Sequence, residues 1–199
     1  MRPALFIKRA RSVILGVTLL ALASCSKDSG ALVDLGQALS TGTADEAVKM
    51  AGANKRVTLI VAEPGWKATT TIADELEAAL KKRGVTVARK GVNVGDPMSG
   101  SFGLKAADFS DVIAGASDTG AIVSLVGAPV LKGGEISRLT AAHPPILVVA
   151  TSQLVPGDQV ALMQLVEGKA IDAAIIDGMD PAAPKSEFFA HYRVLRRPN

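Results

Sequence analysis

The sequence predicts an α/β fold in which helices cover both faces of a mainly parallel sheet of five or six strands, a three-layer α/β/α sandwich. From Arg56 onward, short runs rich in β-branched residues alternate with longer segments of helical periodicity, as in successive βαβ units. Most of these runs are apolar throughout, which is typical of strands buried on both faces. Right-handed crossovers between such units favour the strand order 2-1-3-4-5.

The elements can be placed along the chain from composition and periodicity. The expected strands are residues 57–61, 85–89, 121–126, 146–150 and 171–176, with a last strand at 192–195. Helical periodicity between the strands predicts four helices. The first ends at Gly84, the second spans 104–116, the third lies around 136–139 and the fourth spans 158–168. Strands and helices therefore alternate, as the predicted fold requires.

Apolar side chains at helical spacing define the inner faces of these helices. Ile72, Leu76 and Leu80 form one stripe, and Gly84 ends that helix. Asp158 is the expected N-cap of the last helix. The other inner-face residues are Phe109, Val112, Ile113 and Ala116, then Ile136 and Leu139, then Ala161, Leu162, Leu165 and Val166.

The first 24 residues have the features of an export signal. Arg2, Lys8, Arg9 and Arg11 form a basic start, and residues 12–23 are an uncharged apolar run too short for a comfortable transmembrane helix. The rest of the chain has 18 basic and 19 acidic residues, so the charge gives no support to nucleic-acid binding. A single cysteine excludes an internal disulfide.

Leu22-Ala23-Ser24-Cys25 resembles the lipobox of bacterial lipoproteins, in which the cysteine is acylated and becomes the N-terminus after cleavage. The resemblance implies a lipid anchor on Cys25, because several acyl chains hold a protein stably at a membrane. Ser26 in place of Asp implies, by the same resemblance, the outer membrane facing the periplasm rather than the inner membrane. The alternatives are an ordinary secretory signal with an incidental cysteine, and an uncleaved anchor.

Three parts are expected along the chain: a signal (1–24), a lipidated Cys25 with a tether (25–42), and one α/β domain (43–199). Residues 26–42 are rich in Ser, Gly and other small residues, which is typical of a linker. Thr43 and Glu46 have the spacing of a capping box, so the first helix of the domain is predicted to begin there.

Several segments resemble one lobe of the type I periplasmic solute-binding proteins, the sugar-binding family of ABC importers. They are Glu63-Pro64-Gly65-Trp66 before a long helix, the helix and strand at 111–123, the proline-led strand at 144–148 and the strand at 171–177. The resemblance implies a flavodoxin-like or solute-binding-lobe topology. That family closes two lobes around its ligand, whereas the 175 residues after the signal are too few for a second lobe. Gly65 also stands where the family has a stacking aromatic residue.

Candidate ligand residues follow the carboxyl ends of the strands, where open parallel sheets bind ligands. They are Glu63, Trp66, Gly127, Thr151, Ser152 and Asp177. A Trp ring can stack on a sugar or base while the carboxylates accept hydrogen bonds from hydroxyl groups. The alternative is purely structural: Trp66 packs over the following helix, and the residues after Asp177 form a turn.

Signals for catalysis are weak throughout the sequence; Asp177 and Asp180 could coordinate a cation, but two acids in a Gly/Pro turn are typical of a solvated turn, so no metal or cofactor is expected. The glycine-rich stretch 91–103 has neither the lysine of a P-loop nor the GxGxxG spacing of a dinucleotide site, so we expect a loop there. His143 and His191 are far apart, no GxSxG occurs, and no set of metal ligands is spaced as a site. Arg193, Arg196 and Arg197 suit an edge strand that resists aggregation, or a contact with acidic lipid.

Two functions remain from these observations, both non-catalytic. In the first, a membrane-anchored envelope lipoprotein binds a small solute at the carboxyl edge, which requires a polar, concave edge. In the second, a structural or assembly lipoprotein binds an envelope protein, which requires an exposed apolar patch. A hydrolase with unrecognised residues is a third, weaker candidate. A homodimer of facing domains would rebuild a two-lobed cleft.

Overall fold

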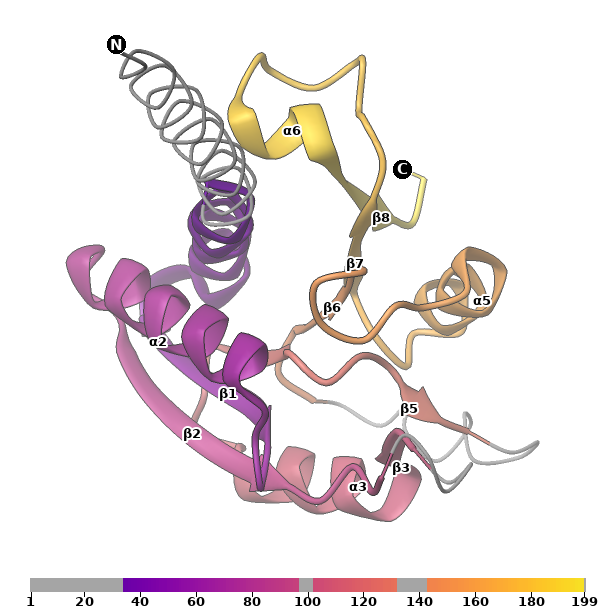
Figure 1. Cartoon of the computed structure of the whole chain (residues 1–199). Helices are drawn as coiled ribbons and strands as arrows, with labels where there is room; N and C mark the ends of the chain where they lie inside the picture. The colour runs from indigo at the N-terminus through magenta and orange to yellow at the C-terminus, as the bar shows by residue number, and fades with distance from the viewer. Residues whose placement is uncertain (1–33, 97–101, 132–142, 199) are drawn as a thin grey trace, which may run out of the picture. The chain divides into compact units, whose positions relative to one another are not determined.

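Six strands form one sheet at the centre of the computed structural model, which describes residues 34–96, 102–131 and 143–198 (Figure 1). The chain divides into two compact units, Met1–Gly36 and Gln37–Asn199, and the sheet belongs to the second. The strands are β1 (Arg56–Ala62), β2 (Thr86–Val92), β4 (Ala121–Ser124), β6 (Ile146–Ala150), β7 (Ala173–Asp177) and β8 (Tyr192–Arg196). Each strand predicted from the sequence is present, with its ends shifted by at most three residues.

The strands lie in the order β2-β1-β4-β6-β7-β8. Neighbours from β2 to β7 are parallel, and β8 pairs with β7 in the antiparallel direction. This confirms the predicted order 2-1-3-4-5, with the C-terminal strand added at one side. The five parallel strands therefore all end at one side of the sheet, which we call the carboxyl edge.

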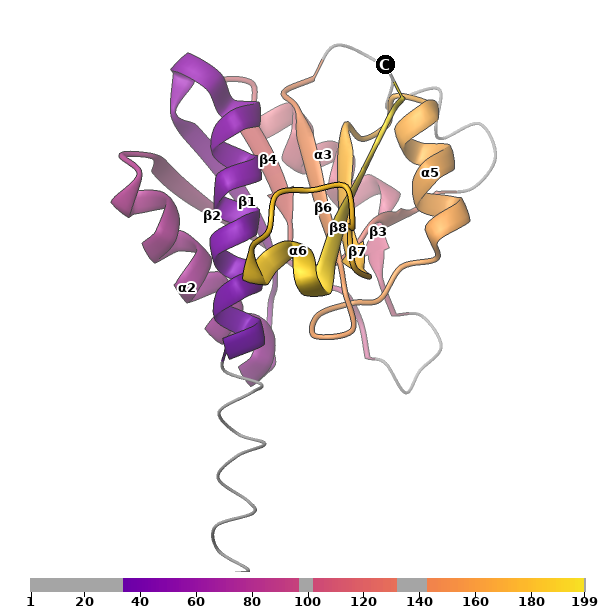
Figure 2. The same cartoon turned by 90° about the horizontal axis from the view of Figure 1, so that it is seen from above.

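Helices cover both faces of the sheet (Figures 1 and 2). They are an N-terminal helix (residues 34–51), α2 (Lys67–Lys82), α3 (Ala106–Gly115), α5 (Gln159–Glu167) and α6 (Glu187–His191), with a short 3-10 turn η1 (Gly52–Asn54). The N-terminal helix, α2 and α6 share one buried apolar cluster with the sheet, and α3 and α5 share another. The predicted α/β/α sandwich is confirmed.

Alternation along the strands builds these two clusters. On β1, Leu59 belongs to one cluster and its neighbour Ile60 to the other, and both side chains are fully buried. In register with Leu59 lies Val123 of β4, which is paired with Leu147 of β6. Each such side chain contributes about 1.5–3 kcal/mol by leaving water, so burial on both faces fixes the sheet in its layers.

The N-terminal helix begins earlier than the sequence predicts. Thr43, the predicted N-cap, lies inside this helix, and residues 37–42 of the predicted tether belong to the compact domain. Leu39 is fully buried, and Gly42 lies against the ring of Phe188 in α6. The domain boundary at residue 43 is therefore wrong, because burial of Leu39 outweighs the weak helix propensity of the Ser, Gly and Thr residues around it.

Smaller differences concern short elements. Leu104, predicted to start a helix, instead lies in β3 (Leu104–Lys105), which pairs with β5 (Pro129–Val130) in a small parallel sheet. Ala161 lies on the exposed side of α5, so its predicted burial is wrong. The helix expected around 136–139 falls outside the described residues. Within the described ranges, no helix combines the length and apolar character needed to cross a membrane.

Candidate functional site

Ser152 and Asp177 meet at the carboxyl edge, where they follow the neighbouring strands β6 and β7. The Ser152 backbone N–H donates a hydrogen bond to Asp177 Oδ2 at 2.7 Å, and its hydroxyl donates to Oδ1 at 3.3 Å. Both carboxylate oxygens thus hold the loop after β6 against the end of β7. This structural role differs from the turn that the sequence suggested as the alternative for Asp177, and it leaves the carboxylate exposed.

A buried polar corner lies beside this pair. Thr151 is fully buried, and within the described part of the chain its Oγ1 has no hydrogen-bond partner. Tyr192 is 2% exposed, and its hydroxyl oxygen accepts a hydrogen bond from Gln153 Nε2 at 2.8 Å. Burial, and to a smaller extent the negative charge of Asp177, raises the pKa of the Tyr192 hydroxyl to about 12.

Glu63 and Trp66 lie in the loop after β1. The Glu63 backbone N–H donates to Val92 O at 2.8 Å, and its exposed side chain lies over Gly91, where a Cβ would be 1.7 Å from Glu63 Oε2. The half-buried Trp66 ring lies with its centroid 5.8 Å from that of Phe102 and packs on the cluster beneath α3 and α5. The indole is therefore held by packing, but on Phe102 and the α3/α5 side of the sheet and not over the following helix α2, as the structural alternative expected.

Gly127 follows β4 and lines a pocket. Its φ of +77° favours glycine, and its carbonyl accepts a hydrogen bond from the buried Ser124 hydroxyl at 2.6 Å. A Cβ at this position would come within 3.1 Å of Val155 Cγ1, so glycine also permits close packing of the loops after β4 and β6.

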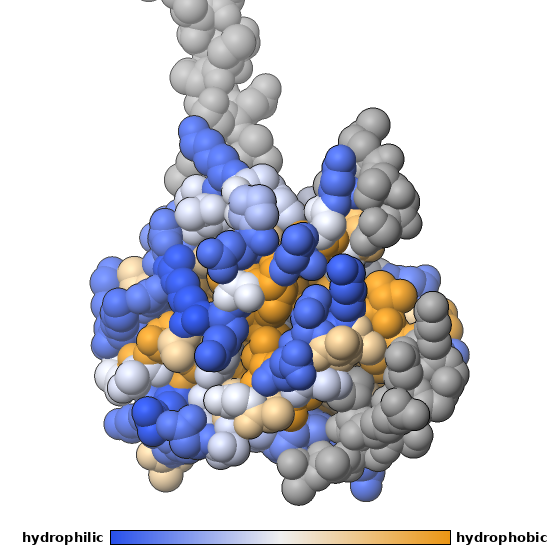
Figure 3. All heavy atoms as spheres, turned by 90° about the horizontal axis from the view of Figure 1, so that it is seen from below, coloured by the Kyte–Doolittle hydropathy of each residue, from blue (hydrophilic) through white to orange (hydrophobic). Residues whose placement is uncertain are grey.

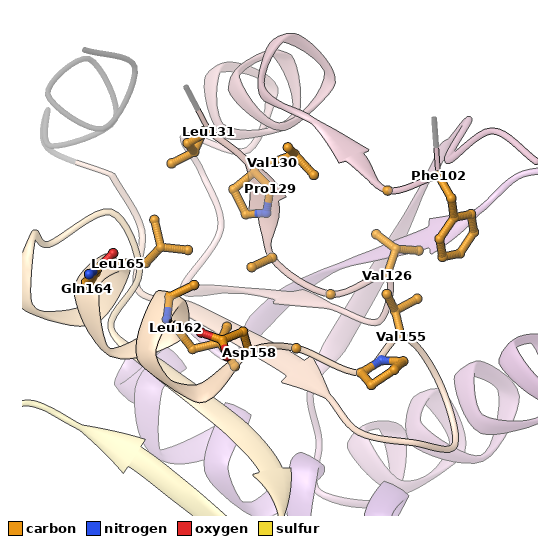
Figure 4. A pocket seen from close by; sticks show the side chains of 16 residues that line it. Phe102, Val126, Pro129, Val130, Leu131, Val155, Asp158, Leu162, Gln164 and Leu165 are labelled. Atoms are coloured by element: carbon orange, nitrogen blue, oxygen red, sulfur yellow. Dashed lines mark hydrogen bonds between the residues drawn. The ribbon is translucent and has the colours of Figure 1, made fainter. Parts of the chain in front are cut away.

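The pocket has a volume of about 470 Å³ and opens along α5 (Figure 4). Its walls are the loops after β4 and β6, the two residues before β3, strand β5 and helix α5. Its lining residues are Phe102, Gly103, Val126 to Leu131, Val155 to Asp158, Ala161, Leu162, Gln164 and Leu165. Among these, Asp158 and Gln164 have polar side chains, so the described walls are largely apolar.

The structure thus separates the predicted residues. Thr151, Ser152 and Asp177 lie together, Glu63 and Trp66 lie after β1, and Gly127 lines the pocket. The aliphatic wall was not singled out from the sequence as a site, because Leu162 and Leu165 have the spacing of ordinary core residues. Asp158 was predicted as a helix cap, and its Oδ1 does accept a hydrogen bond from Ala161 N at 2.8 Å.

Of the other candidates, His143 and Arg196 lie at the opposite edge, Arg193 pairs with Ile176 at the carboxyl edge, and Cys25 falls outside the described residues. His143 lies before β6, with Nδ1 2.8 Å from Pro144 O. Arg196 forms an ion pair with the buried Glu46 of the N-terminal helix, and Arg193 Nη2 donates to Gln159 Oε1 at 2.5 Å. Cys25 falls in the part that the structure does not describe. In the three described ranges, no group of three or more His, Cys, Asp and Glu side chains is placed to hold a metal ion.

No family model and no curated protein matches the sequence. Among solved structures, a LacI transcriptional regulator from Bacteroides fragilis is similar, with a TM-score of 0.52 and 6% identity over 72% of this chain and 47% of that one. A periplasmic ribose ABC transporter protein from Conexibacter woesei has a TM-score of 0.49 and 16% identity over 71% and 45%. An arabinose-binding protein from Geobacillus stearothermophilus has a TM-score of 0.49 and 15% identity over the same shares.

This chain spans less than half the length of each of these three proteins. At such low sequence identity the likeness to the regulator establishes the fold alone, and fold does not fix function. The likeness to the regulator therefore agrees with the α/β architecture and the mostly parallel sheet expected from the sequence. What the domain binds depends on the side chains at its own carboxyl edge.

Proposed function

We propose that this chain is an envelope lipoprotein, anchored through lipid on Cys25, whose α/β domain binds a small ligand at the carboxyl edge of the sheet without catalysing a reaction. The observation that carries the proposal is the 470 Å³ pocket at this edge. Ligand pockets in proteins commonly have volumes of about 300–1,000 Å³, and in open parallel sheets they lie beyond the carboxyl ends of the strands. The pocket meets both of these criteria, but its described walls are largely apolar and not polar as the sequence led us to expect of a solute site.

The order of sequence features before the domain supports the anchor. A basic start, an apolar run of export-signal length and the chain's single cysteine follow one another directly. Eleven residues separate Cys25 from Gln37, where the compact domain begins, so even a fully extended linker keeps the domain within about 40 Å of the membrane surface. The outer membrane facing the periplasm remains our preferred location.

The anchor is tested by intact mass measurement of the protein extracted from a Gram-negative host. We expect loss of the first 24 residues together with the added mass of acyl chains on Cys25. Cys25→Ser abolishes the modification, and Ser24→Ala, which keeps a small residue before the cysteine, is the matched control. An unmodified chain cleaved as an ordinary secreted protein would refute the anchor and leave the binding proposal standing.

Binding is tested by filling the pocket. Ala161 lines the pocket from the exposed side of α5, so Ala161→Phe introduces a ring there without disturbing a buried residue. Ala78→Phe, on the exposed side of α2, is the matched control for the helix-propensity cost. Native mass spectrometry of the exported protein carrying Cys25→Ser, purified from the periplasm, should show a bound small molecule on this chain and on its Ala78→Phe variant, but not on its Ala161→Phe variant.

A second candidate function is binding of an envelope protein. Three large apolar side chains among the described residues are strongly exposed, Val130 (62%), Val160 (65%) and Met179 (67%). Val130 lies in β5, Val160 in α5 and Met179 after β7, and Figure 3 shows hydrophobic residues at the surface between hydrophilic ones. A protein partner whose capture is lost in Val160→Ser and Met179→Ser, but kept in Ala161→Phe, would favour this function over ligand binding.

A further inference from the structure

We propose that the ligand of this pocket is a cationic amphiphile: a molecule with an apolar body, a few carbon–carbon bonds long, and a positively charged amino group. The inference rests on the proposed ligand-binding function and names the chemical class of the ligand. Three observations carry the inference. The walls of the pocket are apolar, the one ionisable side chain in the described walls is an acid, and the loops at the carboxyl edge of the sheet are acidic.

The walls favour an apolar body. Val126, Leu162 and Leu165 form the buried floor, and Pro129 and Val155 stand on opposite sides of the opening (Figure 4). A sugar placed here would lose hydrogen bonds to water on most of its hydroxyl groups and find few partners in return, which is costly for each group buried. An alkyl or aryl group has no hydrogen bonds to water to lose, and the transfer of its apolar surface out of water stabilises the complex.

Asp158 sets the sign of the charge. Among the lining residues that the structure describes, Asp158 has the one ionisable side chain, and these residues include no Lys, Arg or His. Its Oδ1 accepts from Ala161 N at 2.8 Å, so the carboxylate occupies the start of α5, where an anionic ligand group would otherwise bind. An anion would meet like charge there, whereas an amino group can donate to the carboxylate.

The loops around the pocket carry the same sign. In the described loops between the end of each parallel strand and the next helix or strand, four acidic residues stand against one basic residue. They are Glu63, Asp96, Asp158 and Asp180, against Lys185. Asp177 at the end of β7 adds a fifth acid, and Lys67, Lys105 and Arg193 lie in the elements that adjoin these loops. Loops at the opposite edge carry Lys55, Arg83, Lys169 and Arg197, against Asp118 and Asp172. The charge of the loops themselves therefore favours a cation over an anion, and the basic residues of the adjoining elements reduce this preference.

The expected preference is modest. Asp158 is exposed to solvent, and the positive end of the α5 dipole offsets part of its charge. Interactions between exposed charges are worth a few tenths of a kcal/mol to about 1 kcal/mol, so removing this carboxylate should weaken amine binding roughly two- to five-fold. Most of the affinity comes from the apolar walls, and the charge selects among ligands of similar shape.

The test compares n-octylamine, n-octanol and octanoate, which share one apolar chain and differ in charge. Each is titrated below its micelle-forming concentration into residues 25–199 carrying Cys25→Ser, a chain that contains the whole compact domain. Fluorescence of Trp66 reports binding, because it is the chain's single Trp and packs on Phe102 in the pocket wall; calorimetry provides the affinities. We expect octylamine to bind more tightly than octanol, and octanol more tightly than octanoate.

Asp158→Asn isolates the charge, because Asn caps a helix as well as Asp does. We expect it to lower the affinity for octylamine roughly two- to five-fold and to leave octanol unchanged. Glu167→Gln, which removes an acid at the other end of α5, should change neither and serves as the control. Unchanged octylamine affinity in Asp158→Asn, or octanoate binding as tightly as octylamine, overturns the inference.

The outcomes separate this inference from the proposed function. If the three probes bind equally and Ala161→Phe blocks them all, the pocket is a ligand site without charge selection, and the inference alone fails. If D-arabinose binds and octylamine does not, the ligand class is wrong while ligand binding stands. If none of the probes or sugars binds, both fail and binding of a protein partner becomes the remaining function.

Discussion

The hydroxyl of Tyr192 lies in the buried corner beside Gln153 and Asp177, and its ionisation can be observed directly because the chain contains a single tyrosine. Its pKa in the folded protein is raised to about 12, whereas an exposed tyrosine titrates at about 10. Above pH 10 the unfolded chain loses this proton while the folded chain keeps it. The free energy of unfolding should therefore decrease as the pH rises from about 10 to about 12.

Absorbance of the tyrosinate during an alkaline titration measures this shift. We expect ionisation near 12 in the folded protein and near 10 in urea. Asp177→Asn should move the folded value only part of the way back, since burial is the larger cause. Tyr192→Phe should remove this contribution to the pH dependence of stability. A folded-state titration at the ordinary value would show that water reaches the hydroxyl.

The candidate residues show how far residue-level prediction reached. The sequence placed Ser152 and Asp177 at the same edge, because strand ends in a parallel sheet can be located from apolar runs. It could not tell that both Asp177 oxygens accept from Ser152, since that depends on a loop conformation of a few residues. The pocket could not be predicted from the sequence either, because Leu162 and Leu165 have the same helical spacing whether they line a cavity or a solid core.

At the scale of whole elements, the N-terminal helix packs tightly against α6 at Gly42. A Cβ at Gly42 would lie 2.1 Å from Phe188 Cδ2, so Gly42→Ala forces the aromatic ring out of a packed position. Overpacking of this kind costs about 1–3 kcal/mol, more than the gain of about 0.5–1 kcal/mol from a better helix former. We expect a net loss of about 1–2 kcal/mol in urea unfolding.

Gly115→Ala provides the matched control for this helix contact. Gly115 is the last residue of α3, and a Cβ there has nothing within 4 Å. Without a clash the substitution should be neutral, or should stabilise the protein by up to about 1 kcal/mol. Equal effects of Gly42→Ala and Gly115→Ala would mean that the ring of Phe188 does not press on the N-terminal helix.

Elements that depend on tertiary packing, or that are very short, were missed by prediction from the sequence. Long elements with strong periodicity were placed well, as α2 and β6 show. The start of the N-terminal helix was missed because Ser40, Gly42 and Thr43 favour caps and turns in isolation. Their helical conformation is imposed by tertiary packing, including Ser40 Oγ donating to Ile72 O at 3.4 Å across to α2. The two-residue strands β3 and β5 are too short to leave a pattern.

At the scale of the whole domain, the strand order followed from rules of chain connection, whereas the completeness of the binding site did not. Right-handed crossovers restrict five βαβ units to few arrangements, and the observed β2-β1-β4-β6-β7 order is one of them. The resemblance to two-lobed binding proteins suggested that a single lobe needs a facing partner, such as a second copy of the chain. Yet the described walls of the pocket all come from one domain.

Ligand binding is therefore expected to be independent of dimerisation. Native mass spectrometry of residues 25–199 carrying Cys25→Ser, with octylamine present, should show one ligand on the monomer, in a proportion that does not rise with protein concentration. Ala161→Phe should lose the ligand from the monomer, and Ala78→Phe should keep it. Ligand found on dimers alone would contradict this expectation, because it would mean that a second chain supplies a wall of the site, as two facing lobes do.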